Sequence, residues 1–410
     1  MKNCLNCGFQ LAMLLFVVGG VACAAEIPGT GFAALSDVQK YERAIHIMAM
    51  LLVGFGFLMV FVKKYGRSAL TATYLLVSVS IPLYFLKESL HGGSGASAGM
   101  IDKLILAEFA AASLLICAGA VLGRLKMHQY LLLGILFVPF YALNEWIVLN
   151  GGLGLITGKV VDTGGSIVIH AFGAIFGLAV AASMTTLKEY ETPVECDDTS
   201  DRYSLLGSMV LWVFWPSFCA ALVAPADVPA TAVNVILALC GSTLATYFAS
   251  VKLRGKISAA DIANATLAGG VAIGSTCDLA APATAFAIGL LAGIVSTFGF
   301  AVIQGRLTGI TRKVDTCGVL YLHGLPGLLG GIAALFVAVG INFAAQLTGI
   351  LVTVVIAAVS GLVSGKVISI LGRRVEPYVD AEEFECEECA EDEEVLLGAT
   401  VALSNSESIN

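Results

Sequence analysis

The sequence carries very little charge. Of its 410 residues, 13% are Asp, Glu, Lys or Arg and 58% are hydrophobic, which is too apolar for a soluble globular protein of any common class. No basic patch indicates nucleic-acid binding. The chain also lacks a hydrophilic stretch long enough to build a water-filled cleft with a nucleophile or base, so we expect neither an enzyme nor a cofactor. This composition predicts an integral membrane protein.

The negative net charge belongs to one end of the chain. The formal net charge of −8 comes mainly from acidic residues between Glu376 and Glu394, and the rest of the chain is nearly balanced. We expect residues 375–410 to form an acidic, disordered cytoplasmic tail, because such a segment cannot bury a hydrophobic core. Cys386 and Cys389 in this tail make one CxxC pair without a second, which does not favour a metal or redox site.

The first 25 residues resemble a targeting segment. One lysine precedes an apolar stretch at residues 11–21, which is followed by small residues at 22–25. This order is typical of a secretory signal peptide, and the alternative is a first membrane span. The stretch is short for a span, so we predict that residues 1–25 are cleaved.

Eleven apolar runs after this leader are long enough to cross a bilayer. Lys and Arg gather in alternate connections, for example at Lys63, Lys64 and Arg67 after the first run. The positive-inside rule makes those connections cytoplasmic, which places the mature amino terminus outside and the tail inside. We predict an all-α protein of the cell membrane whose helices cover residues 41–62, 69–86, 100–122, 130–149, 162–186, 204–224, 230–251, 257–277, 281–303, 316–338 and 345–371.

One pattern, D-T-x-G-x-x-x-x-H, occurs twice. The first copy runs from Asp162 to His170 and the second from Asp315 to His323. If both copies are helical, a rise of about 1.5 Å per residue places each histidine roughly 12 Å beyond its acid. That is near the middle of a hydrocarbon core about 30 Å thick.

The two copies fall on the fifth and the tenth predicted helices. Helices separated by an odd number of crossings run in opposite directions, so the copies predict two inverted five-helix repeats, at residues 41–190 and 204–338. A last helix at 345–371 completes a membrane domain that covers residues 26–374. Substrate sites of such folds lie where the repeats meet, near the bilayer midplane.

Two histidines at matched depths favour a transport pathway over simple helix packing, because ionisable groups inside a membrane are costly. A neutral imidazole offers one donor and one acceptor, which suits a small polar molecule or a proton relay. Asp162 and Asp315 either attract a cation or cap their helices. Asn264 is predicted to make an interhelical hydrogen bond. No functional role is predicted for the remaining histidines, which are His46, His91 and His128.

Four runs of the sequence resemble the Rhesus (Rh) branch of the ammonium transporter and Rhesus protein superfamily, in its prokaryotic form. They are DTGGSIVIHAFGA from Asp162, WPSF ending at Phe218, ANATLAGG from Ala263 and DTCGVLYLHGLPG from Asp315. They occur in order and on the expected helices. The resemblance covers residues 41–374.

This resemblance implies a homotrimer with a narrow pore in each subunit, which recruits ammonium at an outer vestibule, deprotonates it and conducts ammonia. It implies that His170 and His323 line the pore, that Asp162 is the acid below the outer vestibule and that Phe109 and Phe218 form a gate. The ammonium-transporting branch is expected to carry a tryptophan above the gate, but residues 150–161 contain none. We therefore expect weak ammonium recruitment and a channel for abundant substrate.

Other functions remain open from the sequence. A dry pore also suits carbon dioxide, and the tail suits an ammonium sensor whose partner the sequence does not identify. A third alternative is a membrane cytochrome with His170 and His323 as axial haem ligands.

Overall fold

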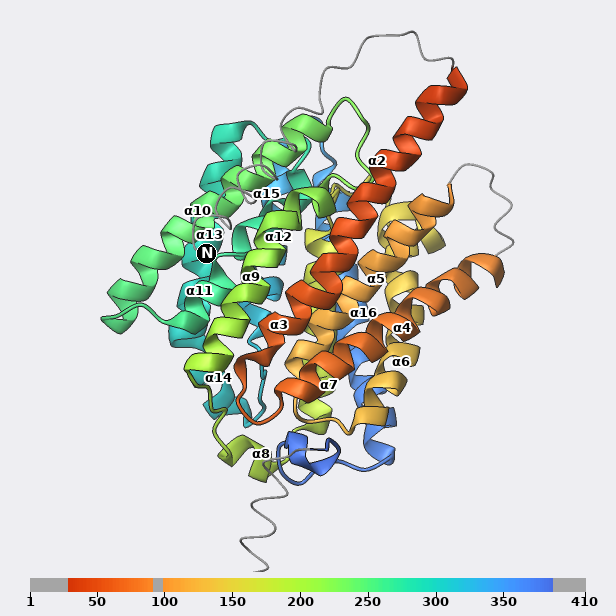
Figure 1. Cartoon of the computed structure of the whole chain (residues 1–410). Coiled ribbons are helices and arrows are strands. Elements are labelled where there is room, and N and C mark those ends of the chain that lie inside the picture. Colours follow the sequence, from red (N-terminus) through yellow and green to blue (C-terminus); the bar gives the residue numbers. More distant parts are fainter. Residues whose placement is uncertain (1–28, 91–98, 386–410) are drawn as a thin grey trace, which may run out of the picture. The chain divides into compact units, whose positions relative to one another are not determined.

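The computed structural model describes residues 29–90 and 99–385, and within these ranges it is helical and contains no strand. The predicted signal peptide, His91 and the Cys386–Cys389 pair lie outside the described residues. Residues up to Gln39 form a unit separate from the rest, and the description below concerns the unit that begins at Lys40. Figure 1 shows its helices with their labels.

The described residues between 29 and 191 contain five long helical segments. Their elements are α2 (Gly29–Ala49), η1 (Met50–Phe55), α3 (Gly56–Leu58), η2 (Met59–Phe61), α4 (Gly66–Leu90), α5 (Met100–Ala120), α6 (Met127–Asn150), η3 (Gly152–Gly154), η4 (Ser166–Ala171), α7 (Phe172–Met184) and α8 (Leu187–Glu191).

The second half repeats this organisation and adds a last helix. Its elements are α9 (Asp198–Cys219), α10 (Val228–Arg254), α11 (Ala259–Ala265), α12 (Ala268–Ile273), η5 (Gly274–Thr276), α13 (Pro282–Phe298), η6 (Gly299–Ile303), α14 (Gln304–Thr311), η7 (Leu320–Gly324), α15 (Leu325–Val337), α16 (Phe343–Ile370) and η8 (Asp380–Glu382).

Nine helical segments of the described chain are long and apolar enough to span a membrane, which confirms an all-α membrane protein. The remaining two of the eleven predicted helices correspond to α9 and to the segment from α11 to η5. The first turn of α9 carries the acids Asp198 and Asp201, and Asp197 before it caps the helix by accepting hydrogen bonds from the Thr199 and Ser200 amides. The segment from α11 to η5 is divided into three short helices, so it lacks one continuous apolar helix.

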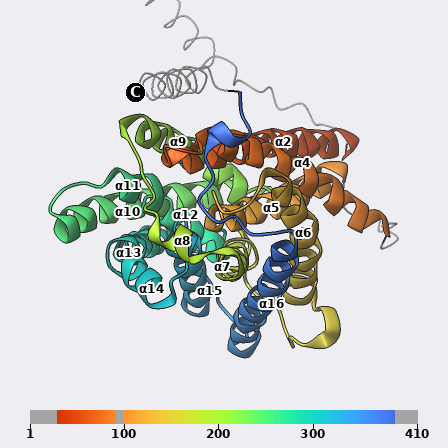
Figure 2. The ribbon, with the colours of Figure 1, turned by 90° about the horizontal axis from the view of Figure 1, so that it is seen from below.

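Figure 2 shows the same helices turned by 90° and seen from below. Helix α7 packs against α5 and α16, and α15 packs against α12 and η4. The contact between α15 and η4 is so close that it requires glycine. A Cβ on Gly327 would lie 2.4 Å from the Ser166 carbonyl oxygen. Small residues that let backbones approach are typical of helix packing in membranes.

The first part of the tail is ordered, contrary to the expected disorder of residues 375–410. The Tyr378 side chain is 1% exposed, and its amide donates to the Gly123 carbonyl. Asp380 accepts hydrogen bonds from the Arg67 and Ser68 amides, at 2.8 and 3.0 Å, and so caps α4 from a distant part of the sequence. Residues 375–385 are held because they satisfy backbone donors that the first turn of a helix leaves free.

A buried ion pair joins two connections beside this docked segment. The Arg124 guanidinium lies 3.8 Å from the Glu189 carboxylate, with side chains 1% and 0% exposed. Burial raises the pKa of the Glu189 carboxyl, and the Thr186 amide and the Arg124 charge oppose that shift. The pair fixes α8 against the α5–α6 connection.

Candidate functional site

The two copies of the D-T-x-G-x-x-x-x-H pattern have the same local structure. In each copy a glycine with positive φ, Gly165 at 77° and Gly318 at 68°, precedes a short π-helix that carries the histidine. A 13-residue α-helix follows in both copies, α7 in the first and α15 in the second. π-Helical turns inside helices occur often at functional sites. Here they place both histidines at the start of the broken helices.

Both acids of the pattern cap these π-helices. Asp162 accepts hydrogen bonds from the Ile167 and Val168 amides and from the Ser275 hydroxyl, at 2.7–3.1 Å. Asp315 accepts from the Val319 and Leu320 amides, at 3.0 Å each. Of the two roles left open from the sequence, the geometry therefore supports capping.

The prediction that a continuous helix runs from each acid to its histidine is wrong. The helices begin at Ser166 and Leu320, so the acids precede them and fold back onto their first amides. Glycine permits the left-handed conformation that this reversal needs. The expected spacing of roughly 12 Å between acid and histidine depended on a continuous helix and does not apply.

His170 and His323 face each other. Their ring planes differ by 2°, their centroids lie 5.3 Å apart, and their Nδ1 atoms are 3.2 Å apart. The side chains are 2% and 3% exposed. One Nδ1 must donate and the other accept, so the two rings hold opposite tautomers when both are neutral. The pair therefore presents one donor Nε2 and one acceptor Nε2.

Further aromatic rings lie on both sides of the histidine pair. The Phe109 and Phe218 centroids lie 4.7 Å apart, and Phe218 is 6.0 Å from His170. On the opposite side Phe55 stacks on His323 at 6.2 Å. The rings are thus arranged as a pair of phenylalanines, a pair of histidines and a further phenylalanine.

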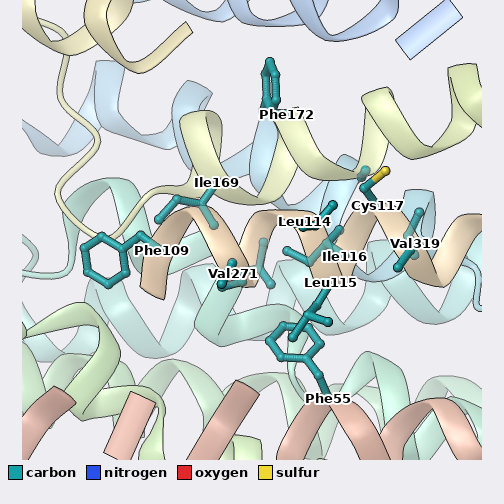
Figure 3. Packing of buried hydrophobic residues seen from close by; sticks show 14 of the residues in the cluster. Phe55, Phe109, Leu114, Leu115, Ile116, Cys117, Ile169, Phe172, Val271 and Val319 are labelled. Atoms are coloured by element: carbon teal, nitrogen blue, oxygen red, sulfur yellow. The ribbon is translucent and has the colours of Figure 1, made fainter. Parts of the chain in front are cut away.

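A small cavity, here called the inner cavity, has His323 in its lining. Its walls come from η1, α5 and the second pattern copy, and its neighbours Leu115 and Phe55 point toward each other in Figure 3. Its lining residues are Phe55, Leu58, Met59, Phe61, Leu115, Ile116, Gly119, Asn264, Cys317, Val319, Leu322 and His323.

A second, larger cavity continues from the inner cavity, because Phe61, Asn264 and Cys317 line both. It adds polar side chains, including Asp201 at the start of α9 and Gln304 in α14. Asn264 donates to the Ala260 carbonyl of its own helix at 2.9 Å, so the expected interhelical bond is not the one formed. A passage therefore leads from His323 toward the end of the molecule where α9 begins.

Several neighbours of the site were not identified from the sequence. Trp215 stacks on His170 with ring centroids 5.6 Å apart, and its side chain is 1% exposed. Phe55 carried no recognisable signal. His46, for which no role was predicted, makes a 2.9 Å hydrogen bond with Ser217, beside Phe218. Each of these contacts joins helices distant in sequence.

The histidine geometry also bears on the haem alternative. Axial ligands of one haem hold the iron and its porphyrin between them. Here the Nδ1 atoms of His170 and His323 are in direct hydrogen-bond contact, which leaves no space for a porphyrin plane between the rings. A cytochrome with these two ligands does not fit this arrangement.

A family model described as the Ammonium Transporter Family matches residues 33–392 of this chain. The chain belongs to that family. Within it, the chain is a member of the Rh branch, of the prokaryotic type. This agrees with the resemblance carried by its two histidine motifs.

Two relatives of this chain are ammonium transporters of Rh type. The ammonium transporter Rh type A of dog is 37% identical over 323 residues, which is 76% of each chain. The human ammonium transporter Rh type B is 38% identical over 309 residues, 73% of this chain and 66% of that protein.

Solved structures show the same fold. A structure titled "Nitrosomonas europaea Rh50 and mechanism of conduction by Rhesus protein family of channels" is 49% identical, with a TM-score of 0.83 over 91% of this chain and 99% of the other. A structure titled "Sensor Amt Protein" is 17% identical with a TM-score of 0.69 over 82% of this chain, and it supports the fold alone.

Proposed function

We propose that this protein is an ammonia channel that recruits ammonium at an outer vestibule, removes its proton and conducts the neutral molecule. The observation that carries the proposal is the parallel pair of His170 and His323, enclosed between the phenylalanine pair and the inner cavity. The path runs from Phe109 and Phe218, past the histidines, to the cavities that end near Asp201. By the positive-inside rule this last end is cytoplasmic.

The chemistry of the path favours a small neutral molecule. An unpaired ion pays a large desolvation cost in such surroundings, whereas ammonia loses a few hydrogen bonds that imidazole nitrogens replace. Ammonia has both donors and an acceptor, which complements the opposite tautomers of the histidine pair. Metal cations have no comparable partners at the histidine pair and would be rejected there.

The proposal is tested by stopped-flow measurement of the interior pH of proteoliposomes under an inward ammonium gradient. Ammonia that enters a vesicle takes up a proton from the interior and raises its pH. We therefore expect alkalinisation to be faster than in protein-free vesicles. A parallel current recording reports whether charge moves with the substrate. Equal rates with and without protein would refute the proposal.

Carbon dioxide is a second candidate, because the inner cavity is lined mainly by apolar side chains that select weakly among small neutral molecules. Isotopic exchange of carbon dioxide in the same vesicles separates the two. A rise in this exchange without a rise in ammonia flux would favour the second candidate.

A further inference from the structure

Glu108 on α5 is a buried acid without a partner. Its side chain is 1% exposed, and neither carboxylate oxygen has a hydrogen-bond partner in the described part of the chain. Leaving a carboxylate in this state costs several kcal/mol unless a proton or a cation joins it. Ionisable groups kept at membrane depth usually mark a transport pathway.

The position of Glu108 places it beside the proposed path. It precedes Phe109, whose ring packs against Phe218. Leu115 and Gly119, which line the inner cavity, follow it by seven and eleven residues. At about 3.6 residues per turn, these separations put the three residues within roughly 20° of one line along the helix. Glu108 therefore lies on the cavity-lining face of α5, at the level of the phenylalanine pair.

Three other acids of this region, Asp162, Glu145 and Asp102, are already engaged. The carboxylate oxygens of Asp162 accept hydrogen bonds from the Ile167 and Val168 amides and from the Ser275 hydroxyl. Glu145 on α6 accepts a 2.6 Å hydrogen bond from the Tyr84 hydroxyl. Asp102, earlier on α5, accepts a 3.0 Å hydrogen bond from Lys40. Glu108 is the acid here whose two oxygens are free to receive a proton.

We propose that Glu108 is the base that deprotonates ammonium at the phenylalanine pair. One N–H bond of ammonium breaks, its electron pair stays on nitrogen, and the proton forms an O–H bond with the carboxylate. Ammonia then passes to the histidines, and the protonated Glu108 returns its proton to the outer solution. This inference rests on the proposed function and assigns the acceptor that it leaves open.

Other titratable groups surround this part of α5, and none makes a hydrogen bond with Glu108 in the described part of the chain. The elements with the most contacts to α5 are α4, α6, α7, η1 and η4, and α2, which carries Arg43 and His46, reaches α5 through the Lys40–Asp102 bond. Of these, η1 and α7 carry no titratable side chain. Those on the other elements near this level are Tyr84 and Lys87 on α4, Tyr141 and Glu145 on α6 and His170 on η4.

The test compares Glu108→Gln with the wild type in proteoliposomes, at constant total ammonium and between about pH 5.5 and 7.5. Glutamine keeps the size of the side chain but accepts no proton. With Glu108 as the base, the wild type uses ammonium as well as free ammonia, so its rate should exceed the E108Q rate several-fold at each pH. The E108Q rate should follow free ammonia and fall about tenfold for each unit of lower pH.

Two further variants make the result specific. Glu108→Asp retains a carboxylate and should keep most of the wild-type rate, while Asp102→Asn removes an acid from the same helix and should match the wild type. An E108Q rate equal to the wild-type rate, or complete loss of flux in both E108Q and E108D at every pH, would overturn the inference and leave the channel function standing. Wild-type vesicles no faster than protein-free ones would overturn the channel function and this inference together.

Discussion

At the scale of single residues, the site depends on buried nitrogen atoms that satisfy one another. The Nδ1 atoms of His170 and His323 share one hydrogen bond, and the described chain offers no partner to the Nε2 atom of His170. Such a nitrogen can bind a passing molecule without first breaking a protein contact. The aromatic rings of Trp215 and Phe55 hold the two imidazoles from outside the pair.

We predict that replacing both histidines, His170→Ala and His323→Ala, abolishes the ammonia-driven alkalinisation or its selectivity over methylammonium. Each single variant leaves one buried Nδ1 without its partner, a cost of about 1–3 kcal/mol. The double variant removes both and should remain folded. Stopped-flow rates and size-exclusion profiles check this. Unchanged ammonia and methylammonium flux in a folded double variant would refute the assignment of the pore.

At the scale of secondary-structure elements, the short π-helices depend on the glycines before them. Gly165 and Gly318 have φ values that residues with a Cβ rarely adopt, and a Cβ would lie 2.3 Å from Ile169 and 2.2 Å from Phe300. Both strain and contact therefore oppose substitution. The acid caps can form only while these turns keep their shape.

We predict that Gly165→Ala and Gly318→Ala each destabilise the protein by more than the roughly 1–2 kcal/mol of left-handed strain alone. Gly151→Ala is the matched control, because Gly151 has a φ of 68° but nothing within 4 Å of a Cβ. Thermal unfolding in detergent measures the difference. Equal shifts for all three variants would show that the contacts at Ile169 and Phe300 are unimportant.

The docked tail segment gives a second prediction at this scale. Asp380→Ala removes the acceptor of the Arg67 and Ser68 amides, and losing a capping side chain costs about 0.5–2 kcal/mol. We expect a lower unfolding temperature and faster proteolysis after residue 374. Asp380→Asn keeps an acceptor oxygen and should lose less. Identical behaviour of the two variants would contradict a capping role.

At the scale of the whole molecule, we expect a homotrimer with one path inside each subunit. The histidines, the phenylalanine pair and the inner cavity all come from one chain, so no partner is needed to complete the path. Native mass spectrometry in mild detergent should find three copies. A stable monomer with full flux would contradict the expected assembly.

The sequence determined much of this architecture because lipid imposes simple rules. Long apolar runs must be helices, the distribution of Lys and Arg predicts their direction, and the repeated pattern marks two related halves. The same pattern singled out both histidines and both acids. Apolar length alone missed the division between α11 and η5, because a broken helix inside the bundle has the same composition as a continuous one.

Tertiary structure alone decided which atoms meet. The sequence left capping by Asp162 as one of two open roles, and its spacing to His170 did not indicate that the acid precedes the helix. The contacts of Trp215 with His170 and of Asp380 with α4 join residues far apart in the sequence. Composition and periodicity describe what each segment can bury, whereas pairing across helices depends on how backbones approach, and a single sequence does not encode that approach locally.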